Sequence, residues 1–213
     1  MLKLTTALSA LFLSLFFISC QKEISGDLPQ NPTEQEPPTP DTPVGDIQGN
    51  YKFISVTQTS DVTQQITSGS DVAKTVTIAA FTSTNNTGTL KIGVTTMTTN
   101  NMSYTANMVA KVYTYSNGSL LDSTDMPFAF NIPPSSGTVS YKMIGSDSIY
   151  FSSGTMLMSD IMQPTHPIGA RLKVEGDKLY ITQNVNLSTT QNVQGATIFS
   201  VSKAIDVITL QKL

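Results

Sequence analysis

Between residue 48 and the C-terminus, apolar side chains recur at every second position along several stretches of the chain. This period places alternate side chains on opposite faces and is typical of a half-buried β-strand. The longest rows run over residues 102–112 and 126–132, and shorter rows lie at 76–80, 90–94, 139–143, 170–174 and 179–187. Threonine and serine fill the positions between, where they suit an exposed sheet surface. The pattern predicts strands with an apolar face and a hydroxyl-rich, solvent-facing one.

Turn signals separate these rows, at residues 85–88, 117–118, 135–137, 145–147 and 175–178. The Asn-Gly pair at 117–118 is the strongest, because both central residues of a type I′ turn need a positive φ. In the last row the apolar parity changes between residues 205–207 and 208–210, which predicts a β-bulge there. Only residues 156–162 are compatible with a short helix, ending before Pro164.

These rows predict an all-β, antiparallel domain of about eight to ten strands. A closed up-and-down barrel and a two-sheet β-sandwich both satisfy the pattern, and the short turns favour the barrel. Residues 49–56 (Gly-Asn-Tyr-Lys-Phe-Ile-Ser-Val) and residues 207–213 resemble the first and last strands of lipocalin-like lipoproteins. The resemblance implies an up-and-down barrel, with the sandwich kept as the alternative.

The N-terminal segment has a different character. An apolar run at residues 7–18 follows the cation Lys3, and it is short for a membrane span of about 20 residues. It leads through Phe17, Ile18 and Ser19 to Cys20, the single cysteine of the chain. This arrangement resembles the lipobox of bacterial lipoproteins, in which the cysteine is diacylated after signal cleavage. The resemblance implies a signal peptide at residues 1–19 and attachment to the lipid bilayer through acylated Cys20.

Gln21, Lys22 and Glu23 then resemble the export signal of Bacteroidetes-type surface lipoproteins. That resemblance implies a lipid-anchored protein of the outer membrane that faces the cell exterior. The rest of the segment 20–47 holds six of the 11 prolines and six of the 15 acidic residues of the chain. This composition buries too little apolar surface to offset the entropy of ordering, so we expect a disordered acidic tether and a folded domain at residues 48–213.

The charge of the domain excludes one class of partner. Removing Lys3, Lys22 and the six acids of residues 21–47 from the chain's 12 bases and 15 acids leaves ten bases and nine acids. No basic stripe is available for nucleic acid.

The search for chemistry returns no catalytic or metal-binding constellation. The single histidine, His166, lies between Thr165 and Pro167, and no metalloprotease, nucleophile-elbow or paired-cysteine motif is present. We therefore predict that the protein is not an enzyme, has no metal site and uses no cofactor.

Three aromatic residues are the candidate ligand contacts. Tyr104, Phe128 and Phe130 lie on one side of their expected strands, where they could line a cavity for a small apolar ligand. Alternatively, such side chains fill a small barrel completely. We expect a membrane-anchored surface lipoprotein with a lipocalin-like domain that binds a small apolar ligand. The alternative is a structural or adhesive lipoprotein that binds protein or glycan through its loops.

Overall fold

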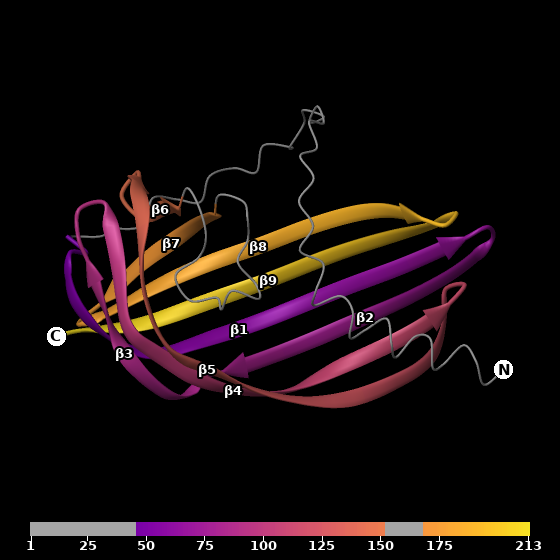
Figure 1. The fold of residues 1–213 in the computed structure, drawn as a ribbon, viewed down its shortest axis with the longest axis horizontal. Helices are drawn as coiled ribbons and strands as arrows, with labels where there is room; N and C mark the ends of the chain where they lie inside the picture. The colour runs from indigo at the N-terminus through magenta and orange to yellow at the C-terminus, as the bar shows by residue number, and fades with distance from the viewer. Residues whose placement is uncertain (1–45, 152–167) are drawn as a thin grey trace. The chain divides into compact units, whose positions relative to one another are not determined.

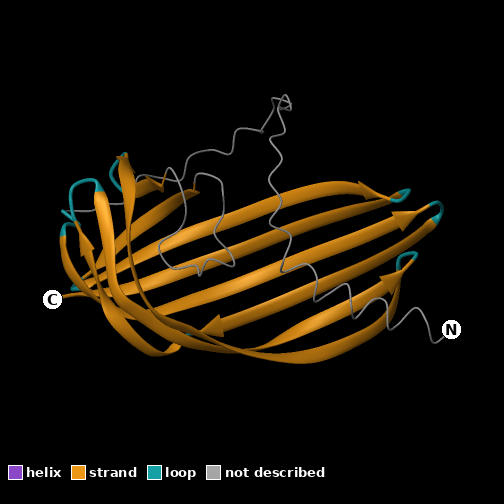
Figure 2. Ribbon diagram, in the orientation of Figure 1, coloured by secondary structure: helices purple, strands orange, loops and turns teal. Residues whose placement is uncertain are grey.

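The computed structural model describes residues 46–151 and 168–213. The expected signal peptide at 1–19, Cys20, the tether up to residue 45, the possible helix at 156–162 and His166 lie outside these ranges. Strands joined by turns make up the described part, and it contains no helix (Figure 2).

The described residues form strands β1 (Gly49–Ser68), β2 (Asp71–Thr82), β3 (Thr84–Ile92), β4 (Thr96–Ser116), β5 (Ser119–Ile144), β6 (Ser148–Phe151), β7 (Ile168–Glu175), β8 (Lys178–Val193) and β9 (Ala196–Lys212). All of them belong to a single antiparallel sheet. From β3 onward each strand pairs with the next along the chain, and β9 returns to pair with β1. The predicted antiparallel up-and-down barrel is confirmed, because a sandwich requires two sheets.

Strands β2 and β3 act as one interrupted strand. Both run antiparallel to β1, β2 along residues 57–68 and β3 along residues 49–52, and both also pair with β4. Ser83 joins them: its amide donates to the Val56 carbonyl, and its Oγ accepts from the Val56 amide, each at 2.8 Å. The nine described strands therefore follow the path of an eight-stranded meander.

The core lies at the end of the sheet where β3, β6 and β7 complete the ring; we call this the closed end. Figure 1 shows these three strands near the C-terminus, while β1, β2, β4, β5, β8 and β9 run on toward the other end. The ring of Phe53 packs on that of Tyr104 at 6.0 Å, and the Tyr141 hydroxyl donates to the Gly93 carbonyl at 2.7 Å. The most deeply buried large side chains include Phe53, Leu90, Ile92, Met97, Ile149, Phe151, Leu179, Ile181 and Leu210.

Beyond the closed end the sheet continues as what we call the extended half. Among the described residues, positions 119–140 of β5 pair with β4 alone, and positions 184–193 of β8 pair with β9 alone. The extended half therefore has the strand order β5-β4-β2-β1-β9-β8, with one free edge on β5 and another on β8 within the described part of the chain.

The turn predictions were right at three sites and wrong at two. Turns do lie at 117–118, 145–147 and 176–177, and Asn117 and Gly118 have the expected positive φ. Residues 85–88 instead belong to β3, where the register with β4 shifts twice, and residues 135–137 belong to β5. At Gly88 a Cβ atom would lie 2.5 Å from the Cα of Met102, so the bulge requires glycine.

Two apolar rows, at residues 76–80 and 205–207, face outward and not toward the core. Phe81 pairs with Gln58 and is buried, so the row at residues 76–80 that contains Ile78 faces outward, and Ile78 is 47% exposed. The predicted bulge in β9 is wrong, because β9 keeps its register with β8 throughout. The irregularity lies opposite, in β1 between Phe53 and Ser55, and Ile205 simply faces solvent.

Ile47, just before the first strand, packs into the core with only 5% exposure, and its carbonyl accepts a 2.7 Å hydrogen bond from the Tyr51 hydroxyl. We expect Ile47→Ala to lower the free energy of unfolding by about 2–5 kcal/mol, the usual cost for a buried isoleucine. Urea denaturation measures it. Val94→Ala, at an exposed turn position, is the control and should shift stability by less than about 0.5 kcal/mol. Equal midpoints for the two variants would show that Ile47 does not belong to the folded unit.

Candidate ligand-binding site

The inner face of the extended half continues the alternation of the core. Along β1, Val56 is buried at the closed end, and the same face carries Gln58, Ser60 and Val62 farther along. On β5 the residues of this face pair across to the inner face of β4. The register therefore assigns each side chain of the extended half to the inner or the outer face.

Three residues of β5 form an apolar row on this inner face: Met126, Phe128 and Phe130. They pair with Ala110, Met108 and Ala106 of β4, respectively. Two of the three sequence-predicted contacts, Phe128 and Phe130, thus face inward as expected. They are not packed as a core, however, since Phe128 remains 42% exposed and Phe130 36%. The apolar row is accessible on the side that a barrel usually fills.

Tyr104, the third predicted residue, lies on the same inner face but inside the closed end. It pairs with Ile132, one inner position beyond the partner of Phe130, and is only 9% exposed. Phe130 itself packs edge-on against Phe81 with ring centroids 5.7 Å apart. The three aromatic residues therefore share one face, with Tyr104 in the core and the other two in the extended half.

The inner face has a different character on the strands across from the apolar row. There β1, β2 and β9 present mainly short or hydroxyl-bearing side chains. The register places Ser60, Thr75, Thr77, Ala79, Ser200, Ser202 and Ala204 inward, together with the larger Val62, Gln64, Ile66 and Ile198. The sequence analysis did not predict this inner surface, because it assigned threonine and serine to the solvent side. The inner face thus combines the apolar row of β5 with a surface of mainly short and hydroxyl-bearing side chains.

Asp206 of β9 lies where these surfaces meet the core, and its side chain is 3% exposed. Gln58 donates a 2.7 Å hydrogen bond from Nε2 to Oδ1, whereas Oδ2 has no hydrogen-bond partner among the described residues. Burial raises the pKa of the Asp206 carboxyl, and the Gln58 hydrogen bond opposes this shift. Burial, followed by the nearby Asp206 charge, also raises the pKa of Tyr104. A carboxylate without full hydrogen bonding is costly to bury, so Asp206 calls for an explanation.

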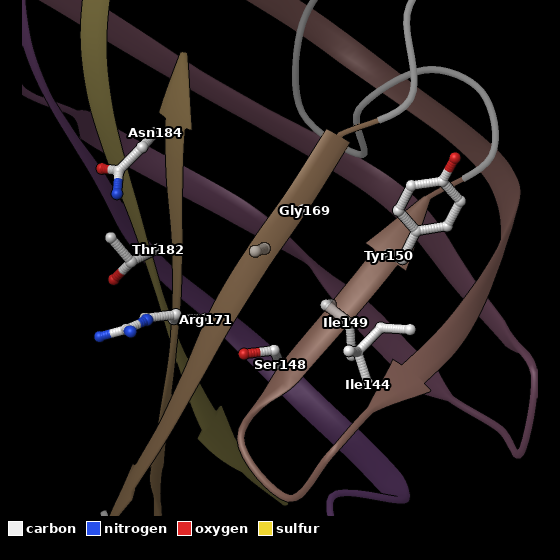
Figure 3. Close-up of a pocket in the computed structure, with 9 residues that line it drawn as sticks. Ile144, Ser148, Ile149, Tyr150, Gly169, Arg171, Thr182 and Asn184 are labelled. Atoms are coloured by element: carbon white, nitrogen blue, oxygen red, sulfur yellow. The ribbon is translucent and has the colours of Figure 1, made fainter. Parts of the chain in front are cut away.

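A second concavity lies on the outer face of β6, β7 and β8 (Figure 3), with a volume of about 340 Å³. Gly169 leaves the middle of it without a side chain. Figure 3 shows Tyr150 on one side and Arg171, Thr182 and Asn184 on the other. An aromatic ring facing a guanidinium and an amide across the pocket can contact a polar ligand, although the pocket is shallow and open.

No group of three potential metal-ligating side chains occurs in residues 46–151 or 168–213. Within the same ranges no helix is long and apolar enough to cross a membrane.

From the raised pKa of the buried Asp206 carboxyl we predict how the stability of the fold depends on pH. A raised folded-state pKa stabilises the fold below the unfolded value of 3.8, and this contribution is lost as the pH rises through the folded pKa. The stability of the wild type relative to Asp206→Asn should therefore fall as the pH increases from about 4 to about 8. Chemical denaturation across this range measures it. Asp61→Asn, on the exposed outer face of β1, is the control and should show no such trend. A pH-independent difference between wild type and Asp206→Asn would contradict the assignment.

Comparison with known proteins identifies no family and no close structural relative. No family model matches the chain, and no curated protein is significantly similar to it. Among solved structures, two crystal structures of Ail, the attachment invasion locus protein of Yersinia pestis, align with 76% of this chain and 99% of their own. One of them is a complex with the heparin analogue sucrose octasulfate. The sequence identities are 6% and 3%, and both TM-scores are 0.17. A TM-score this low establishes neither a common fold nor a common function.

Proposed function

We propose that this chain is a membrane-anchored surface lipoprotein whose β-barrel domain binds a small apolar ligand on the inner face of its extended half. The observation that carries the proposal is the apolar row of Met126, Phe128 and Phe130. These side chains face the interior and keep more than a third of their surface accessible. Burying apolar surface contributes about 25 cal/mol per Å².

The contrast with the closed end supports this reading. There the inner aromatic residues of the same strands are packed: Tyr104 of β4 and Tyr141 of β5 are at most 9% exposed. A barrel that served only as a solid scaffold would gain stability by burying its inner aromatic residues everywhere. Methionine at 108 and 126 adds adaptable apolar surface, which suits a ligand of variable shape.

The anchoring part of the proposal rests on the sequence around Cys20. An acylated cysteine there, followed by a proline-rich acidic tether, would attach the domain to the outer membrane and hold it at the cell surface. The lipocalin-like assignment is supported by the meander and by the pairing of the first and last strands, for example Tyr51 with Lys212. The proposed role needs neither a cofactor nor a catalytic group.

An adhesive role is the second candidate. The observation that favours it is the outer concavity, in which Tyr150 and Arg171 are available to a protein or glycan. The apolar row has no part in such a role. Ligand binding on the inner face therefore separates the two candidates.

A neutral solvatochromic dye such as Nile red should bind the wild type, and Phe128→Ala with Phe130→Ala should weaken binding by about tenfold or more. Phe199→Ala is the matched control, because Phe199 is 39% exposed but faces outward, and it should leave binding unchanged. Each inner substitution should destabilise by less than the 3–5 kcal/mol expected for the buried Phe53→Ala. A full core penalty without dye binding would favour the adhesive candidate.

The proposed acylation of Cys20 leads to a second prediction. Labelled fatty acid should be incorporated into the full-length chain in its host, and Cys20→Ala should abolish both the label and membrane retention, because no other cysteine is present to be acylated. Cell fractionation and metabolic labelling measure the two effects. Ser25→Ala, five residues farther on, should change neither. Membrane retention of unlabelled Cys20→Ala protein would refute the lipoprotein assignment.

A further inference from the structure

Asp206 is the one acidic side chain among the described residues that lies buried on the inner face. Its Oδ1 is satisfied by Gln58, and its Oδ2 is an unpartnered acceptor within the described part of the protein. Buried charged groups are normally paired or fully hydrogen-bonded, because water is lost from both oxygens on folding. The free Oδ2 marks a position where a hydrogen-bond donor is missing.

The protein side chains around Asp206 do not supply a positive charge. Its cross-strand partners are Gln58 of β1 and Gln183 of β8, and both are neutral amides. The nearby titratable group is Tyr104 of β4, a neutral phenol whose pKa is raised by burial and, less, by the Asp206 charge. The carboxyl thus lies among neutral groups, and it forms no ion pair with any described residue.

The inner positions next to Asp206, toward the extended half, carry short side chains. Ser60 follows Gln58 along β1 and pairs with Ala79 on one side and Ala204 on the other. Val185, which pairs with Ala204, is the largest residue at this level of β1, β2, β8 and β9. At its own level Asp206 is flanked by Gln58 and, beyond it, Phe81, whereas the next inner level toward the extended half carries only small side chains on β1, β2 and β9. A ligand at that next level would lie beside the adjacent inner position of β9, Asp206, whose Oδ2 is buried in the unliganded protein.

We infer that the ligand of the inner face is a cationic amphiphile, whose hydrocarbon part lies on the apolar row and whose ammonium group binds Oδ2 of Asp206. This inference rests on the proposed function and names its ligand class. An ammonium group brings three donors and a full positive charge, so it satisfies the free acceptor and neutralises the carboxylate in one contact. A fatty acid would place a second negative charge beside Asp206 and is disfavoured.

The protonation of Asp206 follows from the same contact. Burial favours the neutral carboxyl, and a bound ammonium favours the ionised form. Amine binding should therefore weaken as the pH falls and the carboxyl becomes protonated. Binding of a neutral ligand should not show this dependence, because it makes no charge contact.

The test uses three probes with the same alkyl chain, namely dodecylamine, dodecanol and dodecanoate, each displacing a neutral dye from the folded full-length protein. In the wild type we expect dodecylamine to bind about tenfold or more tightly than dodecanol, and dodecanoate to bind most weakly. Asp206→Asn, which keeps the shape of the side chain, should reduce amine affinity to about that of the alcohol. Dodecanol affinity should stay within about twofold, and Asp61→Asn should behave as wild type.

The outcomes separate the two proposals. If dye and dodecanol bind but the amine has no advantage, or if Asp206→Asn keeps that advantage, the cationic-ligand inference is overturned and the apolar-ligand function stands. If neither dye nor any probe binds the wild type, both fall. Dye binding to Asp206→Asn also verifies that this variant is folded, so a loss of amine preference reports on charge alone.

Discussion

The pairing of β1 with β9 is the interaction on which the rest of the structure depends. It joins the first strand of the domain to the last and runs from residues 51–67 of β1 to residues 197–212 of β9. At the closed end it completes the ring, so that Phe53, Ile208 and Leu210 are enclosed from all sides. In the extended half it joins the two hairpin arms, β1–β2 and β8–β9, into one surface. Without it the sheet would have two more free edges along its middle.

The same alternation of side chains has different consequences in the two halves because the number of neighbouring strands differs. At the closed end an inner side chain meets others from across the ring, and residues such as Met97 and Ile181 lose all contact with solvent. In the extended half the described strands do not complete a ring, because β5 and β8 are edge strands there, so an inner side chain has no neighbours from across a ring. Phe128 is therefore accessible although it lies on the same face of its strand as the buried Tyr141, with the register shift near residue 135 between them.

Sequence alone was enough to predict the fold class, since an alternation of period two, short turns and the absence of a helical pattern are local signals. It could not decide which face of a strand points inward. For β2 that depends on the pairing of Phe81 with Gln58, a contact between residues far apart in the chain. The turn at 117–118 was found because Asn-Gly has a strong preference for positive φ. Asn85 and Gly88 share that preference, yet they form bulges, because positive φ is common to both structures. Phe128 and Phe130 were identified by their face, but their accessibility depends on which strands flank β5.

Asp206 illustrates why the site itself was harder to predict than the fold. In the sequence it sits between Ile205 and Val207, both apolar and both directed outward. A reading based on hydrophobicity gives the inner face to those two residues and places the carboxyl in solvent. The strand register instead turns Ile205 and Val207 outward. It buries the Asp206 carboxyl among the glutamines and small residues of the inner face. A fold selected for stability alone would carry an apolar residue here, since Val56 and Ile208 show that the neighbouring inner positions accept one. Conflicts of this kind between local preference and global fold concentrate at functional sites, which is the physical reason for placing the ligand's polar group at Asp206.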